Sequence, residues 1–193
     1  ATPSRAWRLG KGWTLTRAGG EAVLRGVGHD WAELDHPGWT DFTLKVRFRL
    51  VRGALHVSCR FNGEDPVRRY FAGITPTKLY LRGQAGDRFV ELGERTQFTD
   101  QGWHELQVRA WGELLNVSLD GELRITSRDR QMLAGGSIAL ECLEGSEVLG
   151  ALDFQSEQPF AFALDDVAAG ETLAEFLVIA LRNARLYQDA RRK

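Results

Sequence analysis

The sequence is poor in several residue types that mark specialised classes of protein: it has two cysteines, one methionine and five prolines in 193 residues. Two cysteines are too few for the disulfide framework that stabilises many small secreted domains. No stretch approaches the roughly 18 consecutive apolar residues of a membrane-spanning helix, so we expect no membrane insertion. The N-terminus lacks the charged start and apolar stretch of a secretion signal, which slightly favours the cytoplasm and leaves the compartment open.

The composition also lacks an excess of charge of either sign. Lysine and arginine total 25 residues, aspartate and glutamate total 26, and the formal net charge is -1. A chain this close to neutrality creates no global field that attracts nucleic acid or an anionic membrane, so we expect no nucleic acid partner. The length and the 43% hydrophobic content fit one soluble domain, or one domain with an appendage.

The two cysteines, Cys59 and Cys142, both fall on segments in which apolar residues alternate with polar ones. Thiols in such positions usually act as small buried hydrophobic groups, so we expect two free cysteines. The alternative is one disulfide between strands, which would require an oxidising compartment.

Apolar and polar residues alternate along most of the chain, which is the period of a half-buried β-strand. The clearest example is residues 42–50, whose apolar positions are Phe42, Leu44, Val46, Phe48 and Leu50. Similar segments cover residues 13–16, 22–25, 31–34, 55–61, 70–74, 78–82, 89–92, 137–143 and 160–167. Strands do not alternate with helical segments, so we predict an all-β antiparallel sandwich over residues 1–169.

Residues 102–123 predict two further strands and say most about the fold family. One strand places Leu106 and Val108 on one face, and the next does the same with Val117 and Leu119. With Trp103 and His104 at its start and Asp120 and Gly121 at its end, this segment resembles the laminin-G and concanavalin A-like lectin and glucanase modules. The resemblance implies an antiparallel jelly-roll β-sandwich, a fold that usually presents a surface to glycans or to other proteins.

The final segment, residues 170–193, has a different period. Its apolar residues recur at alternating steps of four and three, at Leu173, Leu177, Ala180, Ala184 and Tyr187. This pattern predicts an amphipathic C-terminal α-helix with a coiled-coil seam. Such a helix needs a partner surface in water, so we expect a homodimer through residues 171–193. Residues 179–191 resemble the exit helix of GAF sensory domains, which implies a linker within a larger signalling protein.

The first candidate for chemistry is Glu33 and Asp35, separated by one residue. The pair resembles the start of the E-x-D-x-x-E motif of laminarinase-type glycoside hydrolases, which share the jelly-roll fold. The third acid of that motif is absent, and Pro37 ends the strand. Because a retaining hydrolase needs a proton donor as well as a nucleophile, we expect this chain not to be an enzyme.

A second candidate is the polar and aromatic cluster His29, Asp30, Trp31 and His36. Two histidines seven residues apart do not have the spacing of a zinc site, which needs three or four ligands. Turn residues and ligand-contacting loop residues are the two remaining interpretations.

The outward faces of the central strands are the strongest candidates for ligand binding. If Leu55, Val57, Cys59 and Phe61 point inward, the residues between them point outward. Applied to all central strands, this reasoning selects His56, Ser58, Arg60, Tyr80, Arg82, Gln107, Asn116 and Glu141. Aromatic rings can stack on sugar rings, and these polar groups can bond to sugar hydroxyls. An ordinary solvated sheet face is the alternative.

Residues 55–60 and 138–141 together resemble the bacterial 3-keto-glycoside hydrolase-like sandwiches. The resemblance implies that Arg60 and Glu141 lie on matching strands of a concave binding face. The sequence Asp165-Asp166-Val167 resembles the ending of jelly-roll carbohydrate-binding modules, which implies a structural calcium ion near Asp165. Charge on an edge strand is the other interpretation of this acidic pair, and we expect no other cofactor.

Together these patterns favour a non-catalytic ligand-recognition module that is part of a larger signalling protein. Carbohydrate is the preferred ligand. A protein-interaction or dimerisation scaffold without a small ligand is the first alternative. An atypical glycoside hydrolase is the second. The sequence does not identify the ligand or the sheet that binds it.

Overall fold

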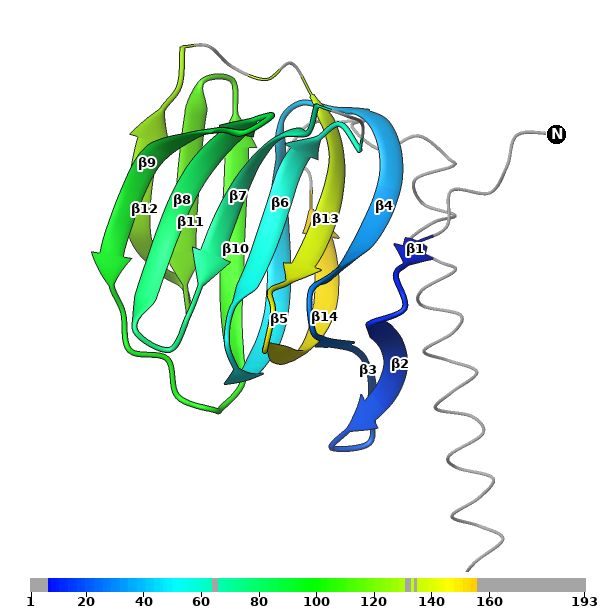
Figure 1. Ribbon diagram of the computed structural model, residues 1–193. Coiled ribbons are helices and arrows are strands. Elements are labelled where there is room, and N and C mark those ends of the chain that lie inside the picture. Colours follow the sequence, from blue (N-terminus) through cyan, green and yellow to red (C-terminus); the bar gives the residue numbers. More distant parts are fainter. Residues whose placement is uncertain (1–6, 64–65, 131–132, 134, 156–193) are drawn as a thin grey trace, which may run out of the picture.

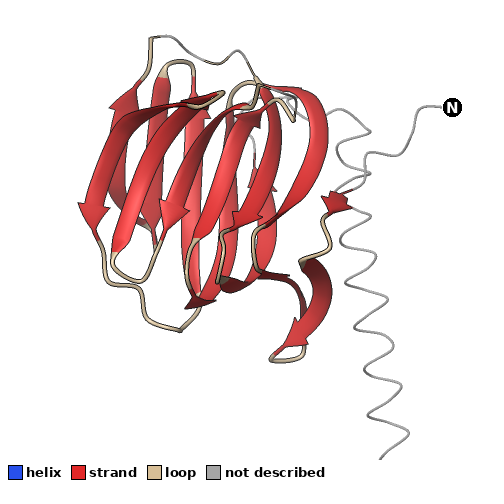
Figure 2. Ribbon diagram, viewed as in Figure 1, coloured by secondary structure: helices blue, strands red, loops and turns tan. Residues whose placement is uncertain are grey.

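The computed structural model describes residues 7–63, 66–130, 133 and 135–155. These residues form two seven-stranded sheets, and every strand pair is antiparallel. The strand Phe160 to Val167, the residue Asp165 and the helix 170–193, all expected from the sequence, lie outside the described residues. The all-β class and the two-layer architecture are confirmed (Figure 2).

The first sheet has the strand order β1-β4-β13-β6-β7-β8-β9, and the second has the order β12-β11-β10-β5-β14-β3-β2 (Figure 1). The strands of the first sheet are β1 (Trp7–Leu9), β4 (Asp30–Trp39), β6 (Leu55–Phe61), β7 (Arg68–Ile74), β8 (Lys78–Ala85), β9 (Arg88–Thr96) and β13 (Gly136–Cys142). Those of the second sheet are β2 (Trp13–Ala18), β3 (Glu21–Val27), β5 (Phe42–Arg52), β10 (His104–Trp111), β11 (Leu114–Leu119), β12 (Glu122–Arg128) and β14 (Glu147–Gln155).

The core lies between the sheets and is built from the alternating apolar positions of the sequence. Leu44, Val46 and Phe48 of β5 are fully buried, and Val46 pairs with Leu106 of β10. The first sheet contributes its own inward positions, such as Val57 of β6, to the same cluster. Each large apolar side chain buried in this way stabilises the fold by roughly 1.5–3 kcal/mol. The two-residue period therefore decides which face of each strand meets the other sheet.

The sequence does not predict three of the strands. β1 has only three residues, too few to show a two-residue period. β12 is an edge strand on which only Ile125 is buried, so its sequence resembles that of a polar loop. β14 lies between β5 and β3 inside the second sheet, but Gly150 interrupts its apolar pattern. Glycine weakens the strand signal because it adds no side chain to either face.

The expected alternation along β6 is wrong at its end. Arg60 has a φ of 49°, and the pairing with β13 shifts register between the pairs Ser58–Ala139 and Phe61–Ser137. An extra residue of this kind is a β-bulge, which reverses the faces of the residues beyond it. Arg60 therefore turns into the molecule, and Phe61 turns outward to stack on Trp31 with ring centroids 5.4 Å apart.

Both cysteines are free and buried, as expected. Burial raises the pKa of Cys59 to about 12 and that of Cys142 to about 12. Within the described part of the chain, no helix has the length and apolar character needed to cross a membrane.

Candidate ligand-binding site

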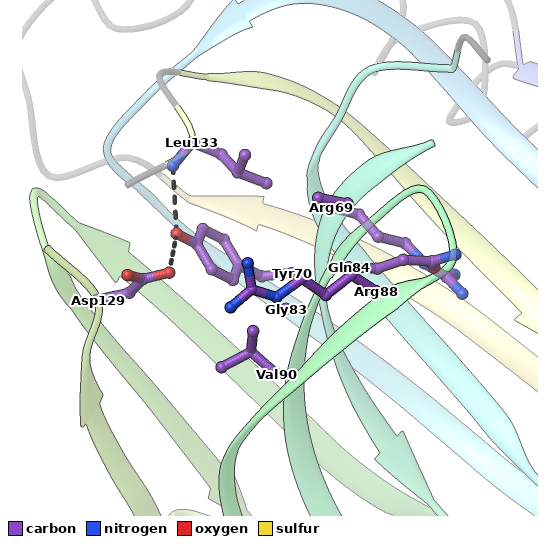
Figure 3. A pocket seen from close by; sticks show the side chains of 9 residues that line it. Arg69, Tyr70, Gly83, Gln84, Arg88, Val90, Asp129 and Leu133 are labelled. Atoms are coloured by element: carbon purple, nitrogen blue, oxygen red, sulfur yellow. Dashed lines mark hydrogen bonds between the residues drawn. The ribbon is translucent and has the colours of Figure 1, made fainter. Parts of the chain in front are cut away.

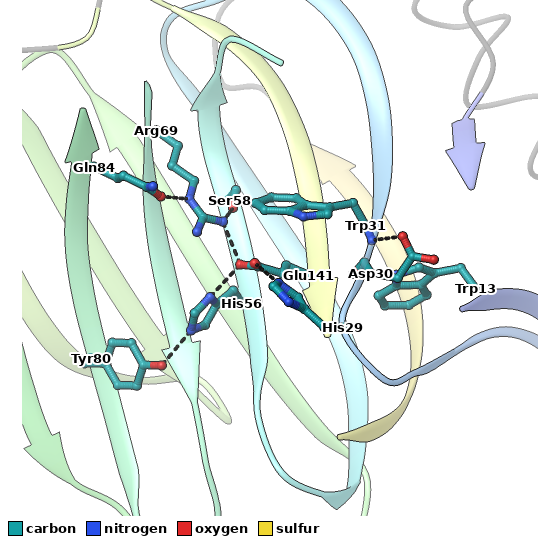
Figure 4. Close-up of polar contacts among 10 residues, drawn as sticks. All are labelled: Trp13, His29, Asp30, Trp31, His56, Ser58, Arg69, Tyr80, Gln84 and Glu141. Carbon is teal, nitrogen blue, oxygen red and sulfur yellow. Dashed lines mark hydrogen bonds and ion pairs between the residues drawn. The ribbon is translucent and has the colours of Figure 1, made fainter. Parts of the chain in front are cut away.

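A row of polar and aromatic residues crosses the outward face of the first sheet. The strand register places Trp31 of β4 opposite Glu141 of β13, and Glu141 opposite His56 of β6. The row continues through Gly73 of β7 to Tyr80 of β8. Figure 4 shows the side chains of His29, His56 and Arg69 meeting at Glu141, and that of Tyr80 meeting His56. Hydrogen bonding on adjacent strands thus brings together residues that are more than 100 positions apart in the sequence, such as His29 and Glu141.

Glu141 is the centre of this cluster and is only 4% exposed. Its Oε2 lies 2.8 Å from Nδ1 of His56 and accepts a hydrogen bond of 2.8 Å from Nη1 of Arg69. Its Oε1 lies 3.0 Å from Nε2 of His29. Burial alone would raise the pKa of Glu141, but the bond from His56 and the charge of Arg69 outweigh it and hold the pKa at about 2. Glu141 is therefore a carboxylate at neutral pH.

His56 links Glu141 to Tyr80, whose hydroxyl lies 2.6 Å from Nε2 of the imidazole. Burial lowers the pKa of His56, and the neighbouring carboxylate only partly offsets this effect. Burial also raises the pKa of Tyr80. His56 is thus neutral and Tyr80 protonated at neutral pH.

Arg69 of β7 holds the other side of the cluster. Its Nη1 also donates to Oγ of Ser58 at 3.0 Å, and its Nε donates to Oε1 of Gln84 at 2.7 Å. The guanidinium lies 4.5 Å from the ring centroid of Trp31 and 4.3 Å from that of Phe71. Burial lowers the pKa of Arg69 and Glu141 opposes this, but a guanidinium stays charged at neutral pH. Nη2 of Arg69 has no hydrogen-bond partner among the described residues.

The edges of the cluster remain accessible. The side chain of His29 is 53% exposed, and Phe89 of β9 is 54% exposed beside Phe71. Arg82 lies 4.7 Å from the ring centroid of Tyr80 and pairs with Glu91. The face therefore offers a carboxylate, several N–H donors and one open aromatic ring, the groups that proteins use to bind polyhydroxylated ligands.

The structure brings together five of the eight residues selected from the sequence. His56, Ser58, Tyr80, Arg82 and Glu141 lie on this one face. Gln107 and Asn116 lie on β10 and β11 of the second sheet, so they do not join the cluster.

The placement of Arg60 on the outward face is wrong. Arg60 is 1% exposed and donates to the backbone oxygens of Thr40 and Gly112, in the β4–β5 and β10–β11 connections. It therefore holds the two sheets together at one end of the sandwich, away from the cluster. The bulge, invisible in the apolar pattern, is the physical reason.

Arg69 and Gln84 were missed as site residues. Arg69 lies next to Tyr70, which points into the core, so the two-residue period of the strand predicts an outward position for Arg69. The sequence does not predict its partners on β13 and β8. The structure also places two members of the local cluster found in the sequence, His29 and Trp31, at the site. Glu33 pairs with Arg8 at the surface, and among the described residues no group of three or more potential ligands is placed to hold a metal ion.

A small pocket of about 100 Å³ opens near the same strands (Figure 3). At its base the hydroxyl of Tyr70 donates to Oδ2 of Asp129 at 2.8 Å and accepts from the amide of Leu133 at 3.1 Å. Tyr70 belongs to the core, so this pocket lies on the inward side of β7. Arg69 and Gln84 border it but point their polar ends away, toward the outward face.

Neither the protein-family models nor the curated proteins contain a match to this sequence. Solved structures do resemble it. The carbohydrate binding module CBM66 from Bacillus subtilis aligns with a TM-score of 0.65 at 17% identity, over 80% of this chain and 98% of that one. A Bacillus subtilis protein of unknown function with a galectin-like fold aligns with a TM-score of 0.58 at 10% identity, over 79% and 91%.

A GH16 protein of Bacteroides ovatus, solved in complex with a G4G4G3G product, aligns with a TM-score of 0.58 at 7% identity, over 75% of this chain and 85% of that one. All three are concanavalin A-like jelly-roll sandwiches. The chain therefore has the concanavalin A-like jelly-roll fold. Identities this low show the fold alone.

Proposed function

We propose that this chain is a carbohydrate-binding β-sandwich that holds its ligand against the outward face of the first sheet, at the cluster centred on Glu141. The observation that carries this proposal is a buried carboxylate surrounded by His56, Arg69 and His29 on a sheet face, where a soluble sandwich normally exposes scattered polar groups. Buried charges are costly even when they are paired, and clusters of ionisable groups with perturbed pKa values concentrate at functional sites. The similarity to a carbohydrate binding module and to a galectin-like fold supports this assignment.

We propose binding without catalysis because the cluster lacks a suitable acid. Glycoside hydrolysis uses one carboxyl group with a raised pKa as proton donor and a second as nucleophile or base. Glu141 has a pKa of about 2, so it carries no proton to donate at neutral pH. The raised pKa of Tyr80 likewise disfavours a phenolate base. The GH16 neighbour shares the fold, and these two pKa shifts argue against a shared chemistry.

Isothermal titration after a glycan-array screen tests this proposal directly. We expect the chain to bind at least one neutral or acidic oligosaccharide, and Glu141→Gln to weaken binding at least tenfold. The matched control is Glu105→Gln, which neutralises a carboxylate on β10 of the second sheet. Binding that Glu105→Gln abolishes and Glu141→Gln leaves intact would assign the ligand to the other face. No binding across the array would reject the carbohydrate function.

The wider setting is a separate proposal. Residues 171–193 provide a dimer contact and a link to further signalling modules, as their heptad pattern indicates. Analytical ultracentrifugation of the full chain and of residues 1–170 tests this. A dimer that becomes a monomer on truncation is the expected result, and a monomer in both samples contradicts it.

A further inference from the structure

The hydrogen-bond chain Tyr80–His56–Glu141 has a direction that its chemistry determines. A carboxylate only accepts hydrogen bonds, and Glu141 is ionised at neutral pH. The contact of 2.8 Å between Oε2 of Glu141 and Nδ1 of His56 therefore requires a proton on Nδ1. Because His56 is neutral, its other ring nitrogen, Nε2, carries a lone pair and no proton.

The lone pair on Nε2 in turn determines the orientation of the Tyr80 hydroxyl. The two atoms lie 2.6 Å apart, and only the phenol has a hydrogen to place between them. The hydroxyl of Tyr80 thus donates its hydrogen bond to Nε2 of His56. The phenolic oxygen keeps its acceptor capacity, and the hydroxyl has no hydrogen left for another partner.

We propose that Tyr80 is a specificity-determining residue of the carbohydrate site, where it serves solely as a hydrogen-bond acceptor at neutral pH. The ligand it selects is a glycan that presents a free hydroxyl hydrogen at this position, and an ether or ester oxygen there is rejected. His56 is a positioning residue, because it acts through Tyr80 by setting the direction of that hydroxyl. This inference rests on the proposed carbohydrate function.

The surroundings of Tyr80, which is 8% exposed, hold its ring in one orientation. Gly73 lies beneath its ring, since a Cβ built there would be 2.2 Å from Cζ, and Arg82 lies over the ring at 4.7 Å. The ring is therefore held flat across β7 and cannot turn its hydroxyl away from His56 without losing both contacts.

Protonation of His56 reverses the direction of its hydrogen bond with Tyr80. The imidazolium would donate from Nε2 to the phenolic oxygen, which frees the hydrogen of Tyr80 to point at the ligand. The charged groups that face His56 are Glu141 of β13, Arg69 of β7 and Arg82 of β8, with the phenol of Tyr80 beside them. None of these four groups changes charge between pH 7 and the pKa of His56, which lies below 6.5. His29 lies on the other oxygen of Glu141, 3.0 Å from Oε1. The imidazolium then occupies one acceptor site of the phenolic oxygen and the freed hydrogen points at the ligand, so we expect a ligand that donates to Tyr80 to bind more weakly as the pH falls through the pKa of His56.

Nitrogen-15 NMR of the imidazole tests the first half of the proposal without any ligand. We expect neutral His56 at pH 7, with a proton on Nδ1 and none on Nε2. A proton on Nε2 in neutral His56, or an imidazolium at pH 7, would overturn the inference and leave the carbohydrate function untouched.

Titration with the highest-affinity oligosaccharide of the array tests the second half. Between pH 7.5 and a pH below the NMR-determined pKa of His56, we expect the affinity to fall by about three- to tenfold, the value of one hydrogen bond. Tyr80→Phe should lower the affinity at pH 7.5 by the same factor and remove the pH dependence. His29→Gln is the control for the other histidine of the cluster, and it should keep the pH dependence.

The outcomes separate the two proposals. Binding that is insensitive to Tyr80→Phe, or whose pH dependence disappears in His29→Gln, rejects the role of Tyr80 and keeps the carbohydrate function. An array without any ligand rejects both.

Discussion

Gly73 and Tyr80 face each other on adjacent strands, and a Cβ added to Gly73 would lie 2.2 Å from Cζ and 2.6 Å from the hydroxyl oxygen of Tyr80. The absence of a side chain at this one position lets the tyrosine ring lie across β7 and reach His56 on β6. A single glycine therefore connects three strands into one polar cluster.

Gly73→Ala should disconnect Tyr80 from the cluster. The added methyl group must displace the ring, which breaks the contact with His56 and costs about 1–3 kcal/mol of folding free energy. We expect glycan affinity to fall about tenfold, as the energy of one to two hydrogen bonds implies. Calorimetry and chemical denaturation measure the two effects. Gly83→Ala is the matched control, because its Cβ would be an ordinary 3.5 Å from Tyr70; an equal loss in that variant would contradict the steric explanation.

Glu141→Gln should destabilise the fold as well as weaken binding. It leaves the buried guanidinium of Arg69 without its ionic partner, and breaking a buried pair in this way costs about 3–5 kcal/mol. Glu91→Gln removes an exposed partner of Arg82 and should cost at most about 1 kcal/mol. Urea denaturation of the two variants checks this. Similar losses would mean that solvent screens Glu141 as well as it screens Glu91.

Arg60→Met should lower the stability of the fold without changing its affinity for glycan. The substitution leaves the carbonyl groups of Thr40 and Gly112 without their buried donor, at a cost of about 3 kcal/mol. Because Arg60 lies between the sheets and away from the Glu141 cluster, we expect the folded variant to bind glycan with unchanged affinity. Arg95→Met, on the exposed strand β9, should change neither quantity. Loss of binding in folded Arg60→Met protein would restore the original assignment of Arg60 to the ligand site.

His104 should make stability depend on pH. Burial lowers its pKa, but hydrogen bonds to Asp120 and Asp100 more than offset this and raise the pKa above 6.5. A raised pKa in the folded state stabilises the protein below the unfolded value of 6.5, and that contribution disappears as the pH rises through the folded pKa. The difference in unfolding free energy between the native protein and His104→Gln should therefore be larger at pH 5.5 than at pH 8.5. A difference that grows with pH would contradict the assigned ion pairs.

Both thiols should be inert in the folded protein. With pKa values raised to about 12 by burial, Cys59 and Cys142 carry almost no thiolate at pH 8. We expect a thiol-specific chromogenic reagent to modify neither residue in buffer. Both should react once the chain is unfolded in about 8 M urea. Rapid labelling of the folded chain would show that one of the two strands opens.

The alternation of apolar and polar residues was sufficient to predict the fold class, most of the strands and the inward positions of β5, β10 and β11. It also placed His56, Ser58, Tyr80, Arg82 and Glu141 on outward positions, because the side-chain period of a strand is a local property. It failed where a local irregularity breaks that period. The bulge at Arg60 exchanges the faces of Arg60 and Phe61, and no feature of the surrounding apolar pattern reports it.

The pairing of strands, by contrast, was decided by tertiary structure alone. The sequence could not say that β13 lies between β4 and β6, and this position is what brings His29 and Glu141 within 3.0 Å. It could not separate Gln107 and Asn116 from the cluster, because outward positions on two different sheets look alike along the chain. Periodicity determines which way a residue faces; only the packing of distant strands determines which residues it meets there.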